Sequence, residues 1–187
     1  MRLSANFTLD ELTNTNKSDE LRAINRETAL NGQETLKNLT ALAQKILQPI
    51  RDFYKQPVVI SSGYRCKALN VAVGGSQTSQ HSYGEAADIQ IDGVSADDIF
   101  EDIRSGDVVD LNNVGQVILE KIGGKEWVHI SLKTEKTALY LVILNKFWYS
   151  IDVVRNALTA LKTLFTLRCS LRVPLSFEPT LLPREPD

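Results

Sequence analysis

Two histidines and one aspartate are the residues of this chain whose side chains could together hold a metal ion. His81 and His129 are the only histidines among 187 residues, and Asp88 follows His81 by seven positions. Hydrolytic zinc sites commonly take three protein ligands from His, Asp and Glu and leave the fourth position to water. Bound zinc lowers the pKa of that water to about 7 and polarises the carbonyl under attack. We therefore predict that His81, Asp88 and His129 bind Zn²⁺ in a hydrolase. By spacing alone, the alternative is a loop histidine at position 81 and a strand-packing histidine at position 129.

Hydrolysis of a peptide also needs a carboxylate that takes a proton from the attacking water and passes it to the leaving amine. Glu126 precedes His129 by three residues and is the predicted general base. Side chains three positions apart on an ideal strand point to opposite faces. The assignment therefore requires the Gly123-Gly124 turn to distort the strand near Glu126. Glu120, at the end of the preceding predicted strand, is the alternative base.

The pattern of apolar residues predicts the elements that must position these side chains. Helices are expected over residues 7–12, 27–54, 67–73 and 95–103, and strands over residues 58–60, 86–91, 115–120 and 127–132. The helix over 27–54 follows from apolar residues spaced three and four apart, and Pro49 is expected to kink its last turn. Residues 14–20 are expected to form a loop. Together these elements predict an α+β fold, with a small, mostly antiparallel sheet that carries the zinc site on one face and has helices packed on the other.

Four short motifs occur in order along the first two thirds of the chain. They are SSGYR at 61–65, LN-x-AVGG at 69–75, SQH-x-x-G-x-A-x-D at 79–88 and WVH at 127–129. This series resembles the zinc D-alanyl-D-alanine carboxypeptidase family, which also contains the vancomycin-resistance D-alanyl-D-alanine dipeptidases and phage L-alanyl-D-glutamate endolysins. The resemblance runs from about Phe7 to about Lys133 and is closest to small members found in phages and prophages.

The resemblance implies a zinc metallopeptidase that hydrolyses bacterial peptidoglycan stem peptides, as a D-Ala carboxypeptidase or as an endopeptidase. It implies that His81, Asp88 and His129 are the zinc ligands and that Glu126 is the base, although many close relatives lack an acid at that position. Arg65 matches an arginine that holds a substrate carboxylate or the developing oxyanion, a role that suits a guanidinium because it binds carboxylates bidentately. A surface salt bridge is the alternative for Arg65.

The C-terminal part of the chain matches nothing in this resemblance. We therefore predict a peptidase domain over residues 1–133 and an extension over 134–187, with an apolar run at 139–144, a helix at 150–167 and a Pro-rich end. An exposed apolar helix there would favour self-association or docking to a partner. The two cysteines, Cys66 and Cys169, are expected to be unpaired thiols.

Charge and hydropathy limit the classes of binding partner and the cellular location that we expect. A net charge of -2 leaves no broad basic surface for nucleic acid. No apolar stretch approaches the ~20 residues of a membrane helix, and the N-terminus lacks the apolar region of a signal peptide. We expect synthesis in the cytoplasm and action on the cell wall after holin-type release.

Two other functions are compatible with a zinc site. One is a non-catalytic, zinc-containing binding module. The signalling domain of Hedgehog proteins resembles the expected fold and keeps zinc, yet it works through protein binding. Glu126 argues against that function, because a purely structural site needs no base beside the metal. The other is an amidase that cleaves the link between sugar and peptide, but the motifs of such enzymes differ from those quoted.

Overall fold

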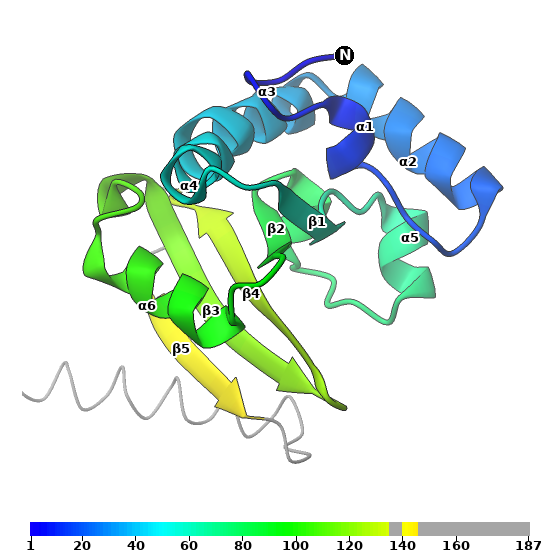
Figure 1. Ribbon diagram of the computed structural model, residues 1–187. Coiled ribbons are helices and arrows are strands. Elements are labelled where there is room, and N and C mark those ends of the chain that lie inside the picture. Colours follow the sequence, from blue (N-terminus) through cyan, green and yellow to red (C-terminus); the bar gives the residue numbers. More distant parts are fainter. Residues whose placement is uncertain (135–139, 146–187) are drawn as a thin grey trace, which may run out of the picture. The chain divides into compact units, whose positions relative to one another are not determined.

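The computed structural model describes residues 1–134 and 140–145 (Figure 1). Its α-helices are α1 (Leu9–Leu12), α2 (Asp19–Asn31), α3 (Gln33–Leu42), α4 (Gln48–Tyr54), α5 (Lys67–Ala72) and α6 (Ala96–Ser105). A π-helical turn covers Ala43–Leu47, and 3-10 turns cover Gln80–Tyr83 and Leu111–Asn113. The strands are β1 (Val58–Ser62), β2 (Ala86–Ile91), β3 (Val114–Ile122), β4 (Lys125–Leu132) and β5 (Tyr140–Asn145).

The strands form one five-stranded sheet in the order β1-β2-β4-β3-β5. The pairs β1–β2, β2–β4 and β3–β4 are antiparallel, and β3–β5 is parallel. The predicted α+β fold with a small, mostly antiparallel sheet is therefore confirmed. In this register Asp88 on β2 lies opposite His129 on β4, and Ile118 on β3 lies on the other side of His129.

One face of the sheet is buried against helices. Residues that alternate with Asp88 and His129 along the strands are almost fully enclosed, among them Ile89, Val128 and Ile130. They share one apolar core with side chains of α3 and α6. Figure 1 shows α6 lying across β3 and β4. Because strand side chains alternate between faces, the opposite face is left to carry the polar residues.

The prediction of one continuous helix over 27–54 is wrong in two respects. The helix is interrupted, and the first helical segment begins earlier in the chain. Gly32 adopts an extended conformation (φ -88°, ψ 99°) and separates α2 from α3. The start lies at Asp19, within the predicted loop, because the Ser18 side chain accepts a hydrogen bond from the Leu21 N–H and caps the helix. The π-helical turn before α4 accommodates Pro49, which cannot donate a backbone hydrogen bond.

The short helix α1 supports the loop that leads to the site. Thr8 and Glu11 form the capping box that their spacing predicts, with the Thr8 N–H donating to Glu11 Oε2 at 2.7 Å. At the other end of α1, the Leu12 carbonyl accepts a hydrogen bond from the Tyr64 N–H at 2.7 Å. A Cβ atom on Gly63 would collide with this carbonyl, so only glycine fits there.

Strand β5 extends the sheet beyond the predicted domain boundary at residue 133. It coincides with the apolar run predicted at 139–144 and pairs with β3. The boundary between 1–133 and 134–187 stays a prediction. Cys66 is a buried free thiol, whereas Cys169, the helix predicted at 150–167 and the Pro-rich end lie outside the described residues. Within residues 1–134 and 140–145, no helix has the length and apolarity needed to cross a membrane.

Candidate metal centre

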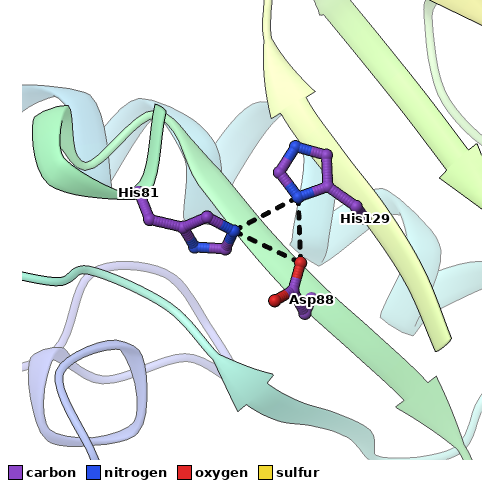
Figure 2. Close-up of side chains that lie close together, drawn as sticks. All are labelled: His81, Asp88 and His129. Atoms are coloured by element: carbon purple, nitrogen blue, oxygen red, sulfur yellow. Dashed lines mark hydrogen bonds and ion pairs between the residues drawn. The ribbon is translucent and has the colours of Figure 1, made fainter. Parts of the chain in front are cut away.

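His81, Asp88 and His129 point toward one another from three separate elements (Figure 2). His81 comes from the 3-10 turn Gln80–Tyr83, Asp88 from β2 and His129 from β4. His81 Nε2 lies 3.2 Å from His129 Nδ1 and 3.3 Å from Asp88 Oδ1. The remaining pair, His129 Nδ1 and Asp88 Oδ1, is 2.9 Å apart. Two imidazole nitrogens and a carboxylate oxygen thus form a compact triangle.

This triangle has the dimensions of one face of a tetrahedral zinc site. Zinc binds histidine nitrogen and carboxylate oxygen at about 2.0–2.2 Å, so neighbouring ligand atoms lie about 3.3 Å apart around a tetrahedral ion. The three measured separations lie close to that value, and the donor set is one that zinc prefers in hydrolytic enzymes. The cluster could therefore hold a metal ion.

The backbone of the SSGYR segment orients His81. The Gly63 carbonyl lies 2.8 Å from His81 Nδ1. A carbonyl can only accept a hydrogen bond, so Nδ1 carries the proton and Nε2 of the neutral ring presents its lone pair to the cluster. Gly84 ends the turn that carries His81 with a φ of +72°, and a side chain there would come within 2.9 Å of the Thr35 carbonyl.

Burial and mutual contacts give Asp88 and His81 the protonation states in which these side chains can bind a metal ion. Burial alone would raise the pKa of Asp88, but its close contacts with the imidazole rings of His129 and His81 outweigh burial and hold this pKa well below its usual range. Burial lowers the pKa of His81 in spite of the neighbouring Asp88 carboxylate. An ionised aspartate and a neutral histidine are the forms that bind a metal ion.

The cluster lies in the wall of a cavity of about 610 Å³. The cavity is also lined by Arg65, Gln80, Gln116, Glu120 and Trp127. Gln80 Nε2 and Trp127 Nε1 are buried there without a hydrogen-bond partner among the described residues. A concave, largely polar cavity of this size is typical of a ligand-binding site.

Arg65 lines the same cavity as the cluster. Its Nη2 donates to Ser79 Oγ at 3.2 Å, and its Nε is buried without a partner in the described part of the chain. Burial lowers the pKa of Arg65, while the negative charges of Asp88 and Glu120 act in the opposite direction. Arginine stays protonated in proteins, so the cavity contains a fixed positive charge with free donors.

The structure places Glu126 away from the candidate metal cluster. Strand β4 is regular from Lys125 onward, with Glu126 paired to Lys121, so the expected distortion near the Gly123-Gly124 turn does not occur. Glu126 consequently faces away from His129. Its Oε1 accepts a hydrogen bond from the Ala96 N–H at 3.2 Å, and its Oε2 lies 3.5 Å from Lys121 Nζ. Glu126 caps the start of α6 and does not line the cavity.

Glu120, the alternative, lines the cavity with the metal cluster. It is two residues from Ile118 on β3, and Ile118 lies opposite His129. Residues two apart on a strand share a face, which places Glu120 on the same side of the sheet as His129. Gln116 occupies this face for the same reason and was not predicted as a site residue. Side chains in the predicted strand GQVILE (115–120) alternate between the two faces of the sheet, and this alternation could have identified Gln116 as a neighbour of Glu120.

Comparison with known proteins agrees with the motifs. A search of curated proteins found no match to this chain. Residues 5–131 match the sequence profile of the family described as Peptidase M15, whose members are zinc-dependent. The match covers all three residues of the metal cluster, both glutamates considered as bases and Arg65. The chain therefore belongs to the peptidase M15 family, the zinc D-alanyl-D-alanine carboxypeptidase type that the four motifs resemble.

Proposed function

We propose that this protein is a zinc-dependent peptidase that hydrolyses the stem peptides of bacterial peptidoglycan. The observation that carries the proposal is the convergence of three metal-binding atoms in a cavity that also holds a carboxylate and a guanidinium. Family membership supports a peptidase in general. The four motifs resemble enzymes that act on D-alanyl peptides, which supports the cell wall as the substrate.

His81, Asp88 and His129 would hold the zinc ion. When bound, zinc supplies Lewis acidity that makes a water molecule nucleophilic at neutral pH and polarises the scissile carbonyl. The hydrogen bond between His81 Nδ1 and the Gly63 carbonyl keeps the ligand nitrogen aimed at the ion.

Glu120 is the general base in this proposal. It takes the proton from the attacking water and returns it to the leaving amine, for which a carboxylate is required beside the reacting atoms. Its place in the cavity and on the same sheet face as His129 supports this role. Glu126 has neither property, because its carboxylate is committed to α6 and to Lys121.

Arg65 holds a negatively charged group of the substrate or the oxyanion that develops at the scissile carbonyl. A guanidinium in a partly buried site binds oxygen anions strongly, because it donates several hydrogen bonds and is weakly hydrated. Ser79 fixes the orientation of the guanidinium through its hydroxyl oxygen. The motifs resemble most closely those of small phage and prophage members of the family. We therefore infer that the enzyme reaches the cell wall through holin-type release.

The test combines metal analysis with digestion of purified peptidoglycan. About one zinc per chain by elemental mass spectrometry, with release of new amino or carboxyl termini that a chelator abolishes, is the expected result. The identity of the released fragments distinguishes a carboxypeptidase from an endopeptidase. Zinc without any cleavage would instead indicate the non-catalytic binding module, and absence of metal would contradict the whole proposal.

A further inference from the structure

A second cavity, of about 300 Å³, adjoins the metal cavity at Arg65. Arg65 lines both cavities. Most of the wall of the second cavity comes from two segments far apart in the sequence, the loop at 14–17 and the end of β1 with the residues that follow it.

The second cavity lies directly beside the metal ligand Asp88. Ser62 on β1 pairs with Asp88 on β2, and the Ser61 hydroxyl donates to the Asp88 carbonyl at 3.1 Å. The β1–β2 register shifts between Ile60 and Ser62, and these residues line the cavity. The second cavity and the candidate metal cluster are therefore joined through the pairing of β1 with β2 and through Arg65.

The charged residues that line the second cavity are both cationic. Its lining includes Lys17 and Arg65, and among the described lining residues there is no aspartate or glutamate. Lys17 is exposed, and its ammonium makes no ion pair within residues 1–134 and 140–145. The remaining polar residues of the lining carry amides and hydroxyls, which can complete the hydrogen bonds of a bound carboxylate.

The other part of the lining is apolar. Ile60, Leu69 and Val73 contribute aliphatic side chains, and Leu69 is almost fully buried. A ligand with a short aliphatic segment that ends in a carboxylate would match both parts, because the methylene groups would contact the aliphatic side chains and the carboxylate would lie near the cations.

The loop that carries Lys17 is held in place before any ligand arrives. The Thr15 carbonyl accepts a hydrogen bond from Arg22 Nε at 3.0 Å, and the Lys17 N–H donates to Thr15 Oγ1 at 3.3 Å. Two residues before Thr15, the Thr13 carbonyl accepts from Asn25 Nδ2 at 2.8 Å. A positioned loop loses less conformational entropy on binding, which favours recognition.

We propose that this second cavity is a specificity site that binds a carboxylate-bearing aliphatic residue of the substrate peptide, with Lys17 and Arg65 as its cations. The proposal rests on the proposed function in that it takes the ligand to be part of the hydrolysed peptide. Two carboxylates of a wall stem peptide have the required chemistry, the α-carboxylate of its γ-linked D-glutamate and the carboxylate at its C-terminus.

The experiment measures peptide binding by isothermal titration calorimetry. The full-length, zinc-loaded protein carries Glu120→Gln so that the peptide survives, and mass spectrometry verifies that it does. The probes are the pentapeptide L-Ala-γ-D-Glu-L-Lys-D-Ala-D-Ala and two versions in which either the D-Glu α-carboxylate or the C-terminal carboxylate is an amide. Lys17→Gln should raise the Kd of the parent peptide about threefold to fivefold, as expected for an exposed ion pair.

A charge-reversal variant of Lys17 and matched control variants test whether the change in Kd depends on the charge at residue 17. Lys17→Glu should raise the Kd by more than Lys17→Gln, about tenfold. Amidation of the carboxylate that occupies the cavity should make the Kd independent of residue 17, and the affected peptide identifies that carboxylate. Lys37→Gln and Lys37→Glu, on the exposed surface of α3 and outside both cavities, should leave every Kd unchanged.

Two outcomes would overturn the proposal. One is a Kd for the parent peptide that does not change in either Lys17 variant. The other is a change that is equally large for all three peptides, since that would reflect the overall charge and not a bound carboxylate. Because binding is measured without turnover, these outcomes are distinct from a failure of the wild-type protein to cleave peptidoglycan.

Discussion

The carbonyl oxygen of Gly63 lies 2.8 Å from Nδ1 of His81, on the side of the imidazole ring away from His129. Gly63 is in turn held against the end of α1, where the next residue, Tyr64, donates its N–H to the Leu12 carbonyl. The metal cluster is therefore connected through one backbone carbonyl to the packing of the N-terminal helix.

Substitution of Gly63 by alanine should weaken metal binding although residue 63 is no ligand. The new methyl group would collide with the Leu12 carbonyl and displace the Gly63 carbonyl from His81. Loss of such a supporting hydrogen bond typically lowers metal affinity about 10–100-fold. Competition with a chromophoric chelator measures the affinity. Gly123→Ala is the control, because it strains the turn between β3 and β4 (φ +58°) but its Cβ atom meets nothing within 4 Å and leaves the Gly63 carbonyl in place. Equal affinities in the two variants would contradict the argument.

Metal removal should lower the thermal stability of the wild-type protein. A ligand that binds only the folded state adds about 2.7 kcal/mol at one hundred times its Kd, so treatment with a chelator should reduce Tm by several degrees. His129→Ala removes one of three ligand atoms and should abolish both zinc retention and activity. Differential scanning calorimetry with and without chelator should show no shift in that variant. A shift of the wild-type size there would mean that zinc binds elsewhere.

The two candidate bases can be separated by a matched pair of substitutions. Glu120→Gln should retain zinc and lose about 10²–10⁴-fold in kcat, because amides cannot accept the proton. Glu126→Gln should retain both zinc and most activity, since Glu126 lies at α6 and outside the cavity. Steady-state kinetics on a soluble stem peptide, with zinc content measured in parallel, decides between them. The reverse pattern would restore Glu126 as the base.

Asn25 should be critical for stability although it is remote from the metal cluster. Its fully buried amide donates to the carbonyls of Thr13 and Tyr64 at 2.8 Å each and accepts from the Cys66 N–H at 2.7 Å. Asn25→Ala would leave three buried backbone groups without partners, each costing about 1–3 kcal/mol. We expect a loss of about 3 kcal/mol or more in the free energy of unfolding, measured by urea denaturation.

The surface control for this prediction is Asn38→Ala. Asn38 also donates from its amide to a backbone carbonyl, that of Tyr83 at 3.0 Å, but this hydrogen bond is exposed to solvent. Water replaces such a bond, so a change of less than about 1 kcal/mol is expected. A loss at Asn25 as small as that at Asn38 would show that the buried amide does not hold the SSGYR segment in place.

The three residues of the candidate metal cluster could be selected from the sequence because the chemistry of metal binding is restrictive. Only two histidines occur in the chain, and few residue types bind zinc, so the number of candidate ligands is small. The motifs around them are short and contiguous, and each depends on local geometry such as the glycine at 84. The capping box at Thr8 and Glu11 is equally local. Such features are encoded within a few neighbouring residues.

Register and long-range packing were decided only by the tertiary structure. Whether Glu120 or Glu126 faces the cluster depends on regular pairing of β3 with β4, and shifting a strand by one residue reverses every side chain. The break at Gly32 was missed because an isolated glycine is tolerated within a helical pattern and does not by itself mark the end of a helix. The cavity between Lys17 and Arg65 joins segments 48 residues apart. Their proximity arises from hydrogen bonds of Asn25 and from strand packing, which no local pattern of residues encodes.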